Sequence, residues 1–347
     1  MVDRVEVSIV IATFDEEVQI GACLSSIFEA EPFTETFEVL VADGGSTDHT
    51  RDVVRAFAVD HPQVRLLDNP GRFAPHGFNT GIRASRGDWI FILGAHSSYD
   101  RSYFRLCLET ARRTGADNTG GWIEFRTHSD DFEARLARSV GTSPFGIAAS
   151  PHRRQVPREG PATSAAFGCY PRRVFEKYGL YDERLVLNQD LELNERILAA
   201  GGIIWMNPEI RISYYGRERI GVLLKHLFRT GRWNAFTWRA APHAFRLRHA
   251  IPAAFTAALG LPGLGLLALA AHQTGALAAA VVESRRAREP GLLLALPPTL
   301  LAVHLAYGAG TFAGAFETLR DVGTARRSAK IEYLPPRAPT GTDGGDR

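Results

Sequence analysis

Asp43, Gly44 and Gly45 follow directly on a short apolar run near the start of the chain. An aspartate at the end of a strand can accept hydrogen bonds from the N–H groups of a heterocycle, and glycines let the backbone approach a ligand closely. These three residues therefore predict a ligand contact. The next residues, Ser46–Asp48, could extend that contact, but their types favour a role as helix caps.

A second acidic loop, Thr13–Glu17 (TFDEE), follows an earlier apolar run. If both runs are parallel strands, their carboxyl ends lie at one edge of the sheet, where α/β proteins bind ligands. We therefore expect the TFDEE loop at the same edge of the sheet as Asp43.

Asp190 is a third candidate, because it stands before a stretch with helical spacing, LELNERILAAG. A positioned carboxylate can deprotonate a hydroxyl group as a general base. Local sequence alone favours a structural role, in which Asp190 is the N-cap and Glu192 interacts with the positive end of the helix.

Arg229–Trp233 (RTGRW) combines two guanidinium groups with an indole. Guanidinium groups bind diphosphate in a bidentate manner, and an indole can stack on a sugar. Residues 225–239 are also rich in basic and aromatic side chains, so an interfacial helix that binds lipid headgroups is the alternative. A basic loop at Arg153, Arg154, Gln155 and Arg158 suits either a lipid phosphate or plain solvation.

The elements that position these residues alternate between strand and helix patterns. We expect an α/β domain with a mostly parallel sheet, because such alternation builds parallel strands joined by helices. The predicted strands are Val5–Ala12, Phe37–Ala42, Gln63–Leu67 and Trp89–Leu93, and the predicted helices are Glu17–Ala30, Asp52–Val59 and Phe78–Ser85.

Composition excludes several classes of protein. The 347 residues carry 40 Lys and Arg against 38 Asp and Glu, so there is no electrostatic reason to expect a nucleic-acid binder. The three cysteines Cys23, Cys107 and Cys169 form no CxxC pair, which favours buried thiols in a reducing compartment over zinc or redox chemistry. The first apolar stretch is too short for a secretory signal, so the N-terminal part is expected in the cytoplasm.

Two uncharged runs follow, Ala250–Ala271 and Pro290–Phe316. Each is long enough to span a bilayer as a helix, and the alternative is a pair of buried helices in a soluble domain. Basic residues before the first run and after the second favour cytoplasmic flanks, whereas Arg285, Arg286 and Arg288 between them oppose a simple two-span topology. The number of crossings stays open. Thr340–Arg347 is expected to be a disordered tail.

Taken in series, SIVIATFDEE, VADGGSTDHT and NPGRFAPHGFNTGIRASRG (residues 69–87) resemble the inverting nucleotide-sugar glycosyltransferases of family 2, which have the GT-A fold. The resemblance covers about residues 6–240 and is greatest to succinoglycan-type exopolysaccharide glycosyltransferases. It implies that the loops at Thr13 and Asp43 hold the uracil of a UDP-sugar. The full set of donor-binding residues that it implies is Thr13, Asp15, Glu17, Asp43, Asn79 and Arg229.

The family has an Asp-x-Asp motif after the fourth strand, where carboxylates bind ribose and a divalent metal. This chain has Gly94-Ala95-His96 instead. Imidazole is a sound ligand for manganese, so the resemblance implies His96 as the metal ligand for Mn²⁺ or Mg²⁺, and leaves the ribose contact unassigned. A structural histidine after an apolar strand is the alternative.

The resemblance also makes Asp190 the catalytic base, with Gln189 in place of the usual acidic neighbour. We therefore expect that this neighbour does not raise the pKa of the base. RTGRW fits the R/Q-x-x-R-W pattern of membrane-bound polysaccharide synthases, which implies roles for Arg232 and Trp233 in the catalytic site.

We thus predict a glycosyltransferase that moves a hexose from a nucleotide diphosphate sugar, expected to be UDP-linked, to a lipid-linked or growing polysaccharide acceptor by one inverting displacement. Its expected location is the cell (inner) membrane, multi-pass, with the catalytic domain facing the cytoplasm. The expected domains are 1–215 (GT-A), 216–249 (interfacial), 250–318 (membrane-spanning) and 319–347 (tail). The alternative, motivated by Gly94 and Gln189, is a catalytically impaired relative that binds sugar nucleotides as a scaffold subunit.

Overall fold

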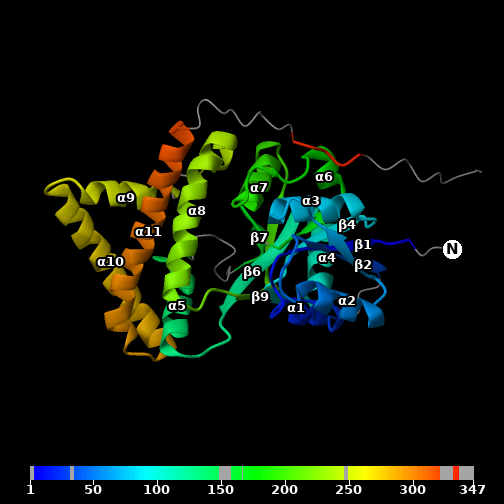
Figure 1. The fold of residues 1–347 in the computed structure, drawn as a ribbon, viewed down its shortest axis with the longest axis horizontal. Helices are drawn as coiled ribbons and strands as arrows, with labels where there is room; N and C mark the ends of the chain where they lie inside the picture. The colour runs from blue at the N-terminus through cyan, green and yellow to red at the C-terminus, as the bar shows by residue number, and fades with distance from the viewer. Residues whose placement is uncertain are drawn as a thin grey trace, which may run out of the picture.

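The computed structural model describes residues 4–31, 35–147, 158–165, 167–245, 249–320 and 331–335. A twisted sheet with helices on its faces lies beside a group of long C-terminal helices (Figure 1). The strands are β1 (Val7–Thr13), β2 (Phe37–Asp43), β3 (Val64–Asp68), β4 (Trp89–Gly94), β5 (Ser97–Tyr99), β6 (Asn118–Arg126), β7 (Gly160–Pro161), β8 (Cys169–Pro171) and β9 (Ile204–Tyr215).

The sheet has the order β3-β2-β1-β4-β8-β6-β9-β5, with β7 paired to β9. The first four strands are parallel, and β8 joins them to the rest by antiparallel pairing. Thr13 pairs with Asp43, so the two acidic loops do start at the same edge of the sheet. The expected α/β fold with a mostly parallel sheet is confirmed.

Strand β1 is buried on both faces, which is why its sequence reads as a continuous apolar run rather than an alternating one. Ile9 and Ile11 face the core under α1 and α4, whereas Val10 faces the core under α3 and α7. The helices of this part are α1 (Ile20–Phe28), α2 (Thr50–Asp60), α3 (Ala74–Ala84), α4 (Tyr103–Thr114), α5 (Phe132–Thr142), α6 (Arg173–Lys177) and α7 (Gln189–Ala199).

Helices α1 and α3 begin at other residues than the sequence predicts. Helix α1 begins at Ile20 rather than Glu17, because the backbone N–H groups of Glu16 and Glu17 donate to Thr50 Oγ1 (2.7 Å) and Asp48 Oδ2 (3.1 Å) in the neighbouring loop. Helix α3 begins before Phe78, since Pro75 suits the first turn of a helix.

The three cysteines are free and buried, as predicted. Burial raises the pKa of the Cys23 thiol to about 12, so it stays protonated at neutral pH. A protonated, buried thiol is a poor nucleophile and metal ligand.

The C-terminal helices are α8 (Ile220–Ala240), the short 3₁₀ turn η2 (Pro242–Ala244), α9 (Ile251–Leu259), α10 (Leu264–Ala287) and α11 (Leu292–Arg320). Helices α8 and α11 lie side by side along most of their length (Figure 1). A Cβ atom on Gly231, Gly310 or Gly314 would collide with the backbone of the partner helix. These glycines therefore let the two helices approach closely.

The run Ala250–Ala271 does not form one helix, contrary to expectation. It breaks at Gly260–Gly263, where Gly263 has a φ of +74° and Pro262 removes a backbone donor. Helix α9 is then only about 14 Å long at 1.5 Å per residue, too short to cross a bilayer. Helices α10 and α11 are long and apolar enough to cross a membrane.

Candidate active site

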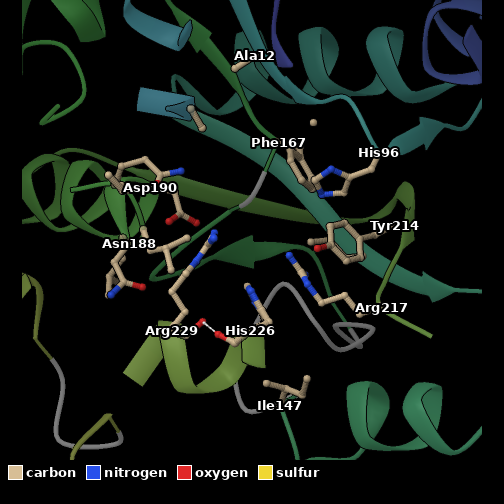
Figure 2. Close-up of a pocket in the computed structure, with 18 of the residues that line it drawn as sticks. Ala12, His96, Ile147, Phe167, Asn188, Asp190, Tyr214, Arg217, His226 and Arg229 are labelled. Carbon is tan, nitrogen blue, oxygen red and sulfur yellow. Dashed lines mark hydrogen bonds between the residues drawn. The ribbon is translucent and has the colours of Figure 1, made fainter. Parts of the chain in front are cut away.

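A cavity of about 900 Å³ opens at the carboxyl ends of β1 and β4, and helices α7, α8 and α11 close its other side. It brings together residues that are far apart in the sequence. Figure 2 shows His96 and Asp190 facing the cavity from opposite sides, with Arg217, His226 and Arg229 on a third side. Of the predicted site residues, Thr13, His96, Asp190 and Arg229 line this cavity.

Thr13 is 5% exposed, and its Oγ1 has no hydrogen-bond partner among the described residues. A buried hydroxyl without a partner costs free energy unless a ligand or a water molecule supplies the missing hydrogen bond. Thr13 is therefore suited to a ligand contact at the end of β1.

Asp15 and Glu17 are exposed and do not line the cavity. Asp15 Oδ1 accepts a hydrogen bond from the Thr47 backbone N–H (2.7 Å), and Glu17 Oε2 accepts one from the His49 N–H (2.9 Å). The two carboxylates tie the TFDEE loop to the loop after β2. Their predicted contact with the donor stays a prediction.

Asp43 is 1% exposed and its carboxylate has partners from its own loop. Oδ1 accepts hydrogen bonds from Arg51 Nη1 (2.8 Å) and from the backbone N–H groups of Gly45 (3.2 Å) and Ser46 (3.1 Å). In this arrangement Asp43 shapes the turn rather than lining the cavity, and its contact with uracil stays a prediction.

Glu16, between the two predicted acids, is the one that faces the cavity. Its Oε1 lies 3.1 Å from His96 Nδ1, and both side chains are only partly exposed. The ring of His96 meets that of Tyr214 edge to face, with centroids 5.0 Å apart. A carboxylate oxygen and an imidazole nitrogen so placed match the donor types that Mn²⁺ accepts.

Gly94, which replaces the first aspartate of the motif, has a steric explanation. A Cβ atom there would lie 2.6 Å from Cε1 of Phe167, whose ring fills the space above the end of β4. Phe167 has a φ of +51° and its ring stacks near Tyr214. The aromatic ring thus occupies the place that an aspartate side chain would need.

Asn79 is 1% exposed and does not line the cavity. Its Nδ2 donates to the Tyr181 carbonyl and to Glu183 Oε1, both at 2.9 Å, and its Oδ1 accepts from the Tyr181 N–H (3.0 Å). Asn79 therefore holds the segment around Tyr181 in place. Its predicted donor contact stays a prediction.

Asp190 is the second residue of α7, so it is not the N-cap that local sequence favours. Asn188 precedes the helix with a φ of +67°, and its Nδ2 donates to Asn234 Oδ1 (3.2 Å) and Thr237 Oγ1 (3.1 Å) of α8. Asn234 in turn donates to the Tyr307 hydroxyl of α11 (2.7 Å). This chain of hydrogen bonds fixes the start of α7 to the C-terminal helices.

Two tyrosine hydroxyls lie close enough to Asp190 to feel its charge. Burial, and to a smaller extent the charge of Asp190, raises the pKa of Tyr170 and Tyr181, so both hydroxyls stay protonated. Gln189 Oε1 is buried without a hydrogen-bond partner among the described residues. No acidic residue adjoins Asp190 at the position where the family has one.

The RTGRW segment lies in α8, and its members point in different directions. Arg229 faces the cavity, whereas Arg232 forms an ion pair with Glu317 of α11 (2.7 Å) and Trp233 lines a separate, smaller cavity. The predicted catalytic roles of Arg232 and Trp233 stay predictions. Arg153, Arg154 and Gln155 of the basic loop lie outside the described residues, as does Thr340–Arg347.

Sequence reasoning missed several residues that line the cavity. Two of them belong to the loops after β1 and β3, in motifs that the sequence had already indicated, and the other three reach the cavity only because the loop after β9, helix α8 and the residues before α9 pack against the sheet. They are Glu16, Arg72, Arg217, His226 and His249.

Residues 8–179 match the family model described as Glycosyl transferase family 2. The chain is 29% identical over 234 residues to the dolichyl N-acetyl-alpha-D-glucosaminyl phosphate 3-beta-D-2,3-diacetamido-2,3-dideoxy-beta-D-glucuronosyltransferase of Methanococcus voltae, covering 65% of this chain and 71% of that protein. It is 31% identical over 199 residues to the succinoglycan biosynthesis protein ExoA of Rhizobium meliloti, covering 57% and 59%.

The fold is similar to that of the mannosyltransferase PcManGT from Pyrobaculum calidifontis, solved in complex with GDP-Man and Mn²⁺. The TM-score is 0.60 at 19% identity, over 91% of this chain and 88% of that chain. The chain is therefore a glycosyltransferase of family 2 with a GT-A fold.

Proposed function

We propose that this glycosyltransferase moves a hexose from a nucleotide diphosphate sugar, UDP-linked, to a lipid-linked acceptor by a single inverting displacement, in the synthesis of a cell-surface polysaccharide. The observation that carries the proposal is that the carboxylate of Asp190 lies across one cavity from His96, which is on the side where we place the donor. Donor and acceptor can then meet between them.

The donor side consists of Thr13, Glu16, Arg72 and His96. The described residues include no group of three His, Cys, Asp or Glu side chains that would hold a metal alone. Glu16 and His96 fit a Mn²⁺ or Mg²⁺ that takes its other ligands from the phosphates of the substrate, as such ions often do. When bound, the ion would neutralise charge on the departing diphosphate.

Asp190 is the proposed general base. Its carboxylate takes the proton of the acceptor hydroxyl as that oxygen attacks the anomeric carbon of the donor sugar, while the bond from that carbon to the diphosphate oxygen breaks. One base suffices because the displacement has one step. The protonated tyrosines beside it hold no negative charge that would compete for this proton.

The acceptor side is cationic. Arg217 and Arg229 line this side of the cavity together with His226 and His249. Guanidinium and imidazolium groups bind phosphate oxygens through charge-assisted hydrogen bonds. This side therefore suits the phosphate of a lipid carrier, as well as the diphosphate that leaves the donor.

The lipid assignment is supported by the helices behind that side. Pro252 of α9 and Tyr307 of α11 line the cavity, and α10 presents apolar side chains to its surroundings, among them Leu266 and Leu267 at 75% and 70% exposure. The relative from Methanococcus voltae is named for a dolichyl-phosphate-linked substrate. We place the protein in the cell (inner) membrane, with the catalytic domain facing the cytoplasm.

The test is transfer from a panel of UDP-, GDP- and dTDP-sugars to lipid extracts, with Asp190→Asn and Glu195→Gln on the same helix as matched variants. We expect Asp190→Asn to lose at least about 100-fold in transfer rate with the affinity for UDP unchanged, because it lacks only the base. Glu195 does not line the cavity, so its variant should keep wild-type activity. Nucleotide binding without transfer by the wild type would instead favour the scaffold subunit.

A further inference from the structure

The turn between α10 and α11, residues 288–291, lies against the domain that carries the sheet. Glu289 in this turn forms an ion pair with Arg135 of α5 (2.9 Å), and the ring of Phe132, also of α5, packs on Gly291. Helix α5 follows β6 in the chain and precedes β7, so it is an integral part of that domain. The start of α11 is therefore on the side of the catalytic domain.

The other end of α11 contacts the same folded unit. Arg232 of α8 pairs with Glu317 (2.7 Å), and Arg239 Nη1 donates to the carbonyl of Thr318 (2.7 Å). The two ends of α11 are about 40 Å apart at 1.5 Å per residue, whereas the hydrocarbon core of a bilayer is about 30 Å thick. If α11 crossed a bilayer, the membrane would separate one of these groups of contacts from the other.

The chain beyond α11 also lies on the catalytic domain. In residues 331–335, Leu334 is 4% exposed and its N–H donates to the carbonyl of Phe175 in α6 (3.1 Å). The Glu332 carbonyl accepts a hydrogen bond from the Leu180 N–H (2.7 Å). The described segments before and after α11 are thus both held on one side.

Helix α8 opposes a crossing for a second reason. The glycines of α11 bring its backbone against that of α8, so the two helices would have to enter the hydrocarbon together. Charged side chains inside a bilayer are costly. Those of α8 are distributed along its whole length, at Lys225, Arg229, Arg232 and Arg239.

Helix α10 has one face on the protein and one apolar face exposed. Ala276 and Ala280 are buried in a cluster with Leu136 and Val140 of α5. A helix with an exposed apolar face that lies along a folded domain suits the membrane interface. The exposed apolar residues of α10, which we call its outer face, are Leu264, Leu266, Leu267, Leu277, Val281 and Val282.

Three arginines at the end of α10, Arg285, Arg286 and Arg288, are exposed. In a hairpin that crosses the bilayer twice they would lie on the side opposite to the catalytic domain, which the positive-inside rule disfavours. In a hairpin that lies flat they are on the same side as the other basic residues. There they can bind anionic lipid headgroups, which attract basic side chains near a membrane surface.

We propose that α10 and α11 do not cross the bilayer but lie in the plane of one leaflet, with the outer face of α10 among the acyl chains and the three arginines on anionic headgroups. This inference rests on the membrane location in the proposed function and states how the chain lies there. The main cavity, which Pro252 of α9 and Tyr307 of α11 line, is then at the level of the headgroups. A lipid-linked acceptor reaches it from the same leaflet.

The first test finds the side of the membrane from which the end of α10 can be reached. The natural cysteines are buried, so an impermeant maleimide should leave the wild type unlabelled in membrane vesicles. Arg286→Cys should be labelled in inside-out vesicles only. Val59→Cys, at an 81% exposed position of α2, reports the side of the catalytic domain and should be labelled in the same vesicles.

The two cysteine variants separate this inference from the proposed function. Labelling of Arg286→Cys and Val59→Cys from opposite sides would mean that the hairpin crosses, and would overturn the flat arrangement while the proposed function stands. Labelling of both variants from the same side supports the flat arrangement. If that side is the outer one, the cytoplasmic location in the proposed function is wrong instead.

The second test measures the lipid contact without turnover, by flotation of purified full-length protein with vesicles of phosphatidylcholine, alone or mixed with phosphatidylglycerol. Replacing Arg285, Arg286 and Arg288 by Ala should weaken binding to the mixed vesicles on the order of 100-fold and leave binding to phosphatidylcholine unchanged. The matched triple alanine variant removes exposed arginines in or next to α2 and α4, far from α10 in Figure 1, and should bind as the wild type does. Its positions are Arg55, Arg101 and Arg113. Equal binding of both triple variants to the mixed vesicles would remove the headgroup contact from the proposal.

Discussion

Glu16 and His96 place a carboxylate oxygen and an imidazole nitrogen 3.1 Å apart at the edge of the main cavity. Two such ligands bind a divalent ion weakly by themselves and more tightly when a nucleotide diphosphate adds its oxygens. The metal affinity should therefore depend on the nucleotide, which gives a readout that is separate from catalysis.

His96→Ala should weaken Mn²⁺ binding in the presence of UDP by about 10- to 100-fold, because it removes a direct nitrogen ligand. Electron paramagnetic resonance of free Mn²⁺ measures this without any turnover. His49→Ala, whose side chain is 82% exposed, is the matched control and should bind Mn²⁺ as the wild type does. An unchanged affinity in His96→Ala would remove His96 from the metal site.

Gly94→Asp recreates the aspartate that the family has, but we expect it to harm the protein. The new side chain would displace the ring of Phe167, and such overpacking costs about 1–3 kcal/mol. The melting temperature should fall and the affinity for Mn²⁺ should not rise. Gly221→Asp, at a position where a Cβ meets open space, should melt as the wild type does. A Gly94→Asp protein of wild-type stability that binds Mn²⁺ more tightly would contradict this prediction.

At the scale of elements, Glu38 of β2 connects three strands. Its carboxylate accepts hydrogen bonds from Ser8 of β1 (2.8 Å), from Arg65 of β3 (3.2 Å) and from the backbone N–H of Arg86 before β4 (2.7 Å). Burial acts to raise the pKa of Glu38, but the hydrogen bonds from Ser8 and Arg86 outweigh it and lower the pKa below 4.5.

Because the folded state lowers this pKa, Glu38 stabilises the fold above pH 4.5, and the contribution is lost as the pH falls through the lowered value. Glu38→Gln should cost about 2 kcal/mol at pH 7 and flatten the loss of stability between pH 5 and pH 3. Melting temperature against pH measures both effects. Glu209→Gln, an exposed residue of β9, should follow the wild-type curve. Parallel curves for Glu38→Gln and wild type would refute the assignment.

At the scale of the whole molecule, the catalytic domain and the apolar helices are one packed structure rather than two tethered parts. Arg232 pairs with Glu317, and Asn188 before α7 reaches α11 through Asn234 and Tyr307. The helices that we place at the membrane therefore also fix the start of the helix that carries Asp190. A lipid-linked acceptor would meet Asp190, the proposed base, where these parts join.

The apolar exposed face of α10 should hold the protein in the membrane. Replacing Leu266 and Leu267 together by Asp should release a large part of the protein at alkaline pH, since charged side chains cost about 2.5–3.5 kcal/mol each in the bilayer. Carbonate extraction of membranes measures this release. Val59→Asp adds a charge at an 81% exposed apolar site on α2 and should leave the protein in the pellet. If the double variant stays in the membrane pellet as completely as the wild type does, α10 is not inserted in the membrane.

Local sequence determined the parallel half of the sheet and the loops at its edge. Strand β1 is buried on both faces, so its residues form a continuous apolar run. Glycines and acidic residues after such runs mark the turns, so the predicted strand ends agree with the observed ones within a few residues. The same reasoning predicted Thr13 at this edge, whereas Asp190 and His96 were singled out by the resemblance to family 2 and not by their local pattern. Pattern alone did not show the break at Gly263 in a run that is apolar throughout.

Only the tertiary structure decided which side chains share the cavity. A carboxylate in an acidic loop can point outward or inward, and the hydrogen bonds between neighbouring loops turned Asp15 outward and left Glu16 facing His96. Likewise, the ion pair with Glu317 directs Arg232 away from the cavity that Arg229 lines. These choices depend on contacts between residues tens of positions apart, which no local pattern of residue types encodes.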